Sequence, residues 1–141
     1  MPTVTLMIKP QTHVRSTQGD AILFRIPEAQ LRAPGLKRKN RLVKYNNYKN
    51  DLVDEAIEQN FAIPDDSFHV IFFMPFNKTA RKHFRLDNNM RPHRVKPDVD
   101  NLYKAFSDAL KKDRDQVIWD ARMTKVWIDH PTGYIQVSWG E

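Results

Sequence analysis

Residues 94–113 read RVKPDVDNLYKAFSDALKKD, and this stretch decides how the chain is expected to fold and where its chemistry lies. Pro97 disfavours helix at the residue before it, and an aspartate can cap a first helical turn, so we expect a helix to begin at Asp98 or Asp100. From there apolar residues recur at intervals of three and four, which is the spacing of one buried helix face. This apolar stripe comprises Leu102, Ala105, Phe106, Ala109 and Leu110.

The two aspartates at the start of this helix have two interpretations. A carboxylate near a helix N-terminus is explained by capping and by the helix dipole. Two carboxylates two residues apart can instead converge on one hard cation, since Mg²⁺ is usually held by one or two carboxylates, waters and substrate phosphate. Because the chain has no cysteine, any metal must be bound through oxygen or imidazole. Asp98 and Asp100 are therefore candidate metal ligands, and Lys104 shares the polar helix face with Asp100 and Asp108.

Length and composition limit the class of protein. The chain has 141 residues, of which 40% are hydrophobic, and no repeat or linker divides it, so we expect a single domain spanning residues 1–141. The N-terminus lacks the features of a secretory signal, and no run approaches the roughly 18 apolar residues of a membrane helix. The absence of cysteine fits a cytoplasmic protein.

The net charge is +6, and the basic residues are concentrated in two blocks. Each block alone fits a solvated loop or a surface for phosphate contacts. Because both accompany the acidic pair, and neither has the apolar face of a membrane anchor, the charge pattern favours nucleic acid. The first block contains Arg32, Lys37, Arg38, Lys39, Arg41, Lys44 and Lys49, and the second contains Lys78, Arg81, Lys82, Arg85, Arg91, Arg94 and Lys96.

Hydrophobic patterns predict an α+β fold, with a mixed or antiparallel sheet packed against about two helices. We expect the two basic blocks to be loops. His130-Pro131-Thr132-Gly133 is a hairpin signal between the last two predicted strands. The expected strands are residues 3–8, 21–26, 68–76, 125–129 and 134–139, and the expected helices are residues 45–59 and the one that begins at Asp98 or Asp100.

Two segments, KPDVDNLYKAFSDAL (96–110) and WDARM (119–123), resemble the signature of the RusA-type Holliday-junction endonucleases. That signature reads K-P-D-x-D-N-L-x-K-x-x-x-D-A-L and is followed by D-D-A/S-Q/R and a hydrophobic residue. The preceding basic loop, ending in RPHRVK, and the apolar strand with MPF are similar in arrangement rather than in sequence. The first 60 residues add little to the resemblance.

The resemblance implies a metal-dependent endodeoxyribonuclease that resolves four-way DNA junctions in recombination and repair. Asp98 and Asp100 match the first two metal-binding carboxylates, and Lys104 matches the lysine one turn into the helix. The implied cofactor is Mg²⁺, with Mn²⁺ as an alternative, and the implied partner is branched double-stranded DNA. Symmetric cleavage needs two sites related by a two-fold axis, so we expect a homodimer. The expected DNA-binding residues are Lys37, Arg38, Lys39, Arg91, Arg94 and Lys96.

The third carboxylate departs from the family pattern, because WDARM has one acid where the signature has two. Aligned through its Ala-Arg-Met tail, the segment places Trp119 at the first acid and Asp120 at the catalytic one. Aligned from its left end, it places Asp120 at the first acid and Ala121 at the catalytic one, which implies an impaired site. We favour Asp120 as the third ligand, because loops vary in length more readily than catalytic acids vanish.

Two alternatives to junction resolution are kept. The same site fits a nuclease acting on other branched DNA, or a catalytically impaired protein that binds DNA junctions. None of the five histidines has metal-ligand spacing, and none is assigned a catalytic role. Phe84, in the second basic block, is a candidate for stacking on DNA, whereas Asp113 and Asp115 are interpreted as loop charges.

Overall fold

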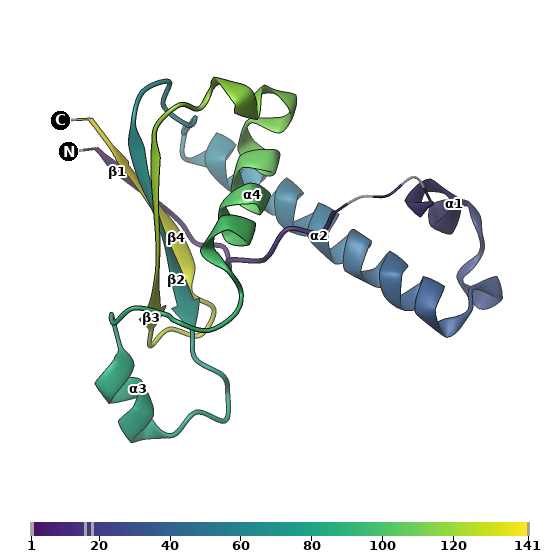
Figure 1. Ribbon diagram of the computed structural model, residues 1–141, viewed down its shortest axis with the longest axis horizontal. Coiled ribbons are helices and arrows are strands. Elements are labelled where there is room, and N and C mark those ends of the chain that lie inside the picture. Colours follow the sequence, from purple (N-terminus) through teal and green to yellow (C-terminus); the bar gives the residue numbers. More distant parts are fainter. Residues whose placement is uncertain (1, 16, 18, 141) are drawn as a thin grey trace.

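A computed structural model describes residues 2–15, 17 and 19–140. Its centre is a mixed sheet in the order β1-β4-β2-β3, in which β4 pairs antiparallel with β1 and β2, whereas β2 and β3 are parallel. Two helices, α2 and α4, cover one face of the sheet (Figure 1). The predicted single α+β domain with a mixed sheet is confirmed. The elements named here are β1 (Thr3–Leu6), β2 (Phe68–Pro75), β3 (Ala121–Ile128), β4 (Tyr134–Trp139), α2 (Ala33–Glu58) and α4 (Val99–Leu110).

Alternation along β2 explains which face of the sheet the helices cover. Phe68, Val70 and Phe72 are buried on the helix side, whereas His69 and Ile71 point to the other face and are partly exposed. The ring of Phe72 meets the ring of Phe106 edge-on, with centroids 6.2 Å apart. A fully buried side chain of this size contributes roughly 1.5–3 kcal/mol relative to its exposed state. This contact anchors α4 on the centre of the sheet.

The helix predicted from residues 94–113 is confirmed. It begins at Val99, with Asp98 as the residue that precedes the first helical turn. Four members of the predicted apolar stripe are buried and Leu110 is partly buried. A short 3₁₀ segment, η2 (Lys112–Val117), leads from the end of α4 towards β3.

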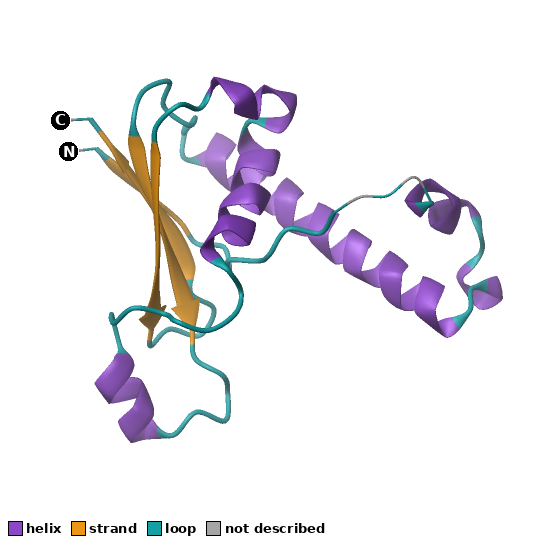
Figure 2. Ribbon diagram, viewed as in Figure 1, coloured by secondary structure: helices purple, strands orange, loops and turns teal. Residues whose placement is uncertain are grey.

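The loop expected for the first basic block is wrong, because most of that block lies in α2. The block is rich in Lys, Arg and Leu, which favour helix, and Pro34 lies in the first turn, where its missing N–H costs nothing. Buried residues of α2 begin only at Leu42, so its first turns project beyond the sheet (Figure 2).

Although α2 has 26 residues, no helix in the described part of the chain combines the length and the apolar character needed to span a membrane.

The strand expected over residues 21–26 is also wrong. These residues form the helix α1 (Asp20–Arg25), followed by the 3₁₀ turn η1 (Glu28–Gln30), at the far end of the projecting part of α2 (Figure 1). Arg38 holds α1 against α2, since its Nε and Nη2 donate to the two carboxylate oxygens of Asp20 at 3.1 and 3.0 Å. A short apolar run does not distinguish strand from helix, and here the ion pair accompanies a helix.

The hairpin predicted between the last two strands is wrong, because β2 lies between β3 and β4. The connecting loop must therefore pass across the end of β2. Gly133 makes this close passage, since a Cβ atom there would lie 2.2 Å from the Phe73 carbonyl oxygen, and its φ is +72°. The second basic block is not wholly a loop either, because it contains the helix α3 (Lys82–Asn88).

We predict that Asp20→Asn loosens α1 from α2. The Arg38 guanidinium lowers the pKa of Asp20 to about 2, and a hydrogen bond from the Thr17 N–H adds to this effect. A lowered folded-state pKa means that the ionised carboxylate stabilises this contact fully above about pH 4, with the contribution lost as the pH falls towards 2. NMR titration of the α1 amides should show this transition in the unmodified chain.

In Asp20→Asn, the α1 amides should be shifted at neutral pH and the low-pH transition should disappear. Asp54→Asn, which removes from α2 an exposed carboxylate that forms no ion pair with any described residue, is the matched control. Identical α1 spectra for the Asp20 variant and the unmodified chain would contradict the assignment.

Candidate active site

The predicted carboxylate pair lies at the exposed start of α4. Asp98 precedes the first helical residue and makes no side-chain capping hydrogen bond, whereas Asp100 Oδ1 accepts the N–H of Asn101 at 3.0 Å. Neither carboxylate forms an ion pair with any described residue. Capping therefore does not account for both acids, and each carboxylate keeps lone pairs that could bind a cation.

Basic residues surround this pair. Asp98 and Asp100 line an open pocket of about 650 Å³ together with Arg94, Lys96 and Lys125. Arg94 and Lys96 are exposed and have no carboxylate partner among the described residues. The pocket thus presents two carboxylates for a cation beside cationic side chains suited to phosphate.

The segment before α4 is attached to the outer edge of β3. The Met90 N–H donates to the Trp127 carbonyl at 2.8 Å, the Trp127 N–H to the Arg91 carbonyl at 2.9 Å, and the His93 N–H to the Lys125 carbonyl at 3.1 Å. The side chain of Lys125 continues this attachment, because its Nζ donates to the carbonyls of Val95 and Pro97. These bonds fix the backbone that leads directly into Asp98.

Lys125 is the residue of this pocket that the sequence reasoning missed. Burial lowers its pKa, while the negative charge of Asp98 opposes that shift. The available signal was a lysine between Met123 and Trp127, at alternate positions of a strand where apolar residues would be expected on one face.

Lys104 lies one turn beyond the pocket and does not line it. Its Nζ donates to Asp115 Oδ2 at 3.2 Å and lies 3.4 Å from Asp108 Oδ1. The hydrogen bond to Asp115 and the charge of Asp108 raise its pKa. Asp108 also pairs with His13 Nε2 at 3.0 Å, so it belongs to a network that joins the N-terminal segment to α4. Asp115, interpreted from the sequence as a loop charge, is thus an ion-pair partner of Lys104.

Asp120 lies apart from the other two candidate ligands. It directly precedes β3, five residues before Lys125, which corresponds to about 16 Å along a strand. It lines a different pocket, with His69 and Arg122. Among the side chains that the structure describes, no group of three or more His, Asp or Glu could hold a metal ion. One copy of the chain therefore brings Asp98 and Asp100 together but does not add Asp120.

The candidate DNA-binding residues differ in their availability. The Arg38 guanidinium donates hydrogen bonds to Asp20 and to the Arg15 carbonyl. Lys39 Nζ lies 5.7 Å from the ring centroid of Phe24, whereas Lys37 is exposed. The candidates nearest the carboxylate pair are all exposed, and these are Arg91, Arg94 and Lys96. The segment just before α4 thus offers free cations close to the acids.

Phe84, the predicted stacking residue, belongs to an aromatic cluster at the end of β3. Its ring meets those of Phe76 and Trp127 edge-on, and Phe76 stacks on Trp127 with centroids 4.8 Å apart. The ring centroids of His93 and Trp127 lie 4.1 Å apart, and burial lowers the pKa of His93. Phe84 is 43% exposed, so one part of its ring packs α3 onto β3 and another faces solvent.

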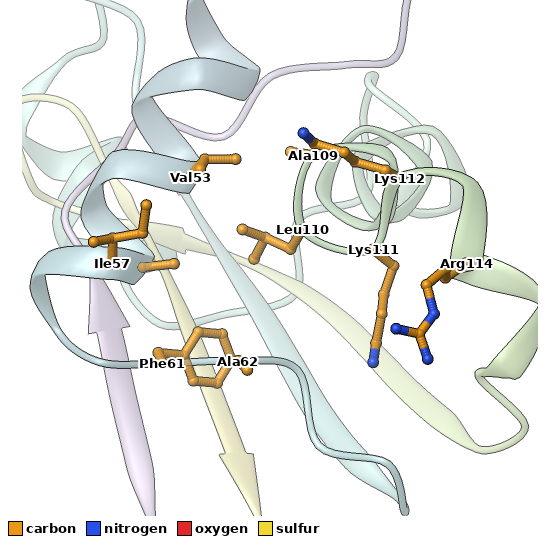
Figure 3. Close-up of a pocket in the computed structure, with 10 residues that line it drawn as sticks. Val53, Ile57, Phe61, Ala62, Ala109, Leu110, Lys111, Lys112 and Arg114 are labelled. Atoms are coloured by element: carbon orange, nitrogen blue, oxygen red, sulfur yellow. The ribbon is translucent and has the colours of Figure 1, made fainter.

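A separate apolar groove of about 410 Å³ lies at the opposite end of α4. Figure 3 shows Leu110 pointing into it, with Val53 and Ile57 on one side and Lys111 and Arg114 on the other. Among the side chains that the structure describes, its lining contains no carboxylate, hydroxyl or imidazole group. The described lining of the groove is apolar and basic, whereas the pocket at the start of α4 contains two carboxylates and is the candidate active site.

Comparison with known proteins identifies the group to which this arrangement belongs. The profile of the RusA endodeoxyribonucleases matches residues 27–138. The match includes Asp98, Asp100, Lys104 and Asp120, whereas α1 lies outside it. Comparison with curated proteins finds no match. Because the profile covers most of the chain, the protein belongs to the RusA endodeoxyribonuclease family.

Proposed function

We propose that this endodeoxyribonuclease is Mg²⁺-dependent, recognises branched DNA and resolves four-way junctions. The observation that carries the proposal is the pair of exposed carboxylates at the start of α4, which have no ion-pair partner in the described chain although basic residues surround them. An exposed carboxylate is often left unpaired, but two carboxylates two residues apart at one helix start repel each other, and a shared cation would relieve that repulsion.

Asp98 and Asp100 fit Mg²⁺ by number and by chemistry. They supply oxygen donors, and Mg²⁺ typically takes one or two carboxylates and completes its shell with waters and substrate phosphate. Mn²⁺ accepts the same donors. When bound, the ion would activate water for attack on the phosphodiester and stabilise the leaving oxygen.

The remaining residues of the site would position DNA. Arg94 and Lys96 would contact phosphates beside the carboxylate pair, and Lys37 would contact a more distant part of the substrate from the projecting helix α2. Lys104 would neutralise charge that develops on the reacting phosphate, once DNA draws its ammonium away from Asp115 and Asp108.

A homodimer offers a source for the third carboxylate. In a two-fold assembly, a residue of one copy can complete a site on the other. Asp120 is exposed at the start of β3 and remote from Asp98 in its own chain, so we propose that it joins the Asp98–Asp100 pair of the partner copy. This arrangement would couple cleavage to dimer formation and give two symmetric sites for a four-way junction.

The impaired junction-binding protein is kept as the second candidate. It is favoured by the absence, in the described part of a single copy, of any three-residue group that could hold a metal. It differs from the proposed nuclease in having no metal-dependent cleavage. Cleavage of four-way, Y-shaped and linear DNA, each with and without Mg²⁺, separates the two candidates and also reports the preferred branch.

We predict that Asp98→Asn and Asp100→Asn each lower the cleavage rate of four-way DNA by at least about 100-fold, the scale on which loss of one well-placed electrostatic group lowers kcat. Junction binding without metal should be unchanged or tighter, because a negative charge near phosphates has been removed. Gel assays of cleavage and binding provide both measurements. Asp54→Asn on α2 serves as the control, and full cleavage by both variants would refute the site.

A mixture of Asp98→Asn and Asp120→Asn chains tests whether Asp120 acts across a dimer. Each variant alone should be inactive, because every site then lacks one ligand. In the mixed dimer one site carries both substitutions and the other carries neither, so nicking of one strand should return. If mixing restores nothing while each variant still dimerises, Asp120 does not act from the partner copy.

The exposed basic residues before α4 should set the salt dependence of DNA binding. Each lost phosphate contact lowers the slope of log affinity against log salt by about 0.9, so the double variant Arg94→Ala/Lys96→Ala should lower it by about 1.8. Fluorescence anisotropy over a range of salt concentrations measures the slope. Lys112→Ala, which removes an exposed cation at the other end of α4, should leave it unchanged. An unaltered slope in the double variant would assign these residues to solubility alone.

A further inference from the structure

We propose that Lys125 is a positioning residue of the active site, which holds the backbone before α4 so that Asp98 and Asp100 share one cation. This inference rests on the proposed metal-binding role of the pair. It is carried by the two hydrogen bonds from Lys125 Nζ to the carbonyls of Val95 and Pro97, and by the place of Lys125 in the lining of the same pocket.

The placement of Lys125 on β3 explains how it acts. It lies opposite Phe72 in the parallel ladder, so its side chain emerges on the face of the sheet that the helices cover. Because β3 is the outer strand of the sheet, the side chain can reach the segment that runs alongside it. Lys125 thereby joins a rigid strand to the residues immediately before Asp98.

The backbone contacts of Lys125 act in the same direction as its side chain. Its carbonyl accepts the N–H of His93, while its ammonium binds two carbonyls further along the same segment. Residues 93–97 are thus held at both ends by a single residue of the sheet. The two carbonyl bonds use two of the three N–H donors of the ammonium, which forms no ion pair with Asp98 in the structure.

A lysine that points inward on an edge strand has a simpler explanation, since such charges prevent strands of different molecules from pairing. That role requires only a charge and makes no demand on residues 94–98. The two carbonyl bonds are what the edge role does not explain. Replacing Lys125 should therefore affect the geometry of the acids and not merely the association of the protein.

The test measures Mn²⁺ binding by electron paramagnetic resonance in Lys125→Met, Lys125→Arg and the control Lys112→Met. Loss of positive charge near Asp98 would by itself strengthen cation binding. Loss of positioning would instead weaken cation binding, since removal of an outer-sphere partner typically lowers metal affinity by about 10- to 100-fold.

We expect Lys125→Met to bind Mn²⁺ about tenfold more weakly and to need correspondingly more Mg²⁺ for half-maximal cleavage. Lys125→Arg should recover most of the affinity, and Lys112→Met should match the unmodified chain.

Circular dichroism and size-exclusion chromatography establish that each variant is folded and has the assembly state of the unmodified chain. Mn²⁺ binding by Lys125→Met that is equal to or tighter than that of the unmodified chain would overturn the proposal. If the unmodified chain binds no Mn²⁺, the proposed metal site fails. In that case, hydrogen exchange tests the positioning role without a metal. Amides of residues 94–101 should exchange faster in Lys125→Met than in the unmodified chain, and equal exchange rates would overturn the positioning role.

Discussion

The attachment of residues 90–97 to the outer edge of β3 determines where the candidate active site lies. Backbone groups must find hydrogen-bond partners, and here Met90, Arg91 and His93 find them on a strand whose other edge is already paired with β2. The segment then has one direction in which to continue, and α4 begins where it ends. The buried apolar stripe of α4 fixes the rotation of the helix against the sheet, so its first turn presents Asp98 and Asp100 to solvent beside β3.

Where local sequence carried enough information, the prediction of the fold succeeded. Pro97, the adjacent aspartates and the apolar stripe specify α4 without reference to the rest of the chain, and the apolar run at residues 68–76 similarly identifies β2. It failed at residues 21–26, because this short run fits either a strand or a helix, and the ion pair that accompanies the helix involves Arg38, 18 residues from Asp20. It also failed at the final hairpin, because no local signal shows that β2 enters between β3 and β4.

The sequence likewise predicted only those residues of the candidate site that are close together in the chain. Asp98 and Asp100 could be found because two acids so close in sequence at a helix start must also be close in space. Lys125 contacts the segment before Asp98 from 28 and 30 residues away, and only the pairing of β3 with that segment brings it there. Arg38 is an example of a residue whose ion pair the sequence did not reveal. It lies in a basic block that suggested phosphate binding, but its guanidinium donates to both carboxylate oxygens of Asp20. Composition predicts the sign of a surface, but ion pairs determine which charges remain available.

At the start of α4, two acids that form no ion pair with any described residue line one pocket together with three basic side chains. Asp20 and Asp108 are each paired with a cation, and Lys104 with two carboxylates, as expected where side chains are free to minimise their electrostatic energy. Asp98 and Asp100 lie among cations yet form no ion pair with any described residue, whereas Lys125 donates to carbonyls and Arg94 and Lys96 are exposed. Two neighbouring like charges raise the free energy of the folded chain unless a cation binds between them. The proposed binding site for a divalent ion would give this arrangement a physical reason that stability alone does not supply.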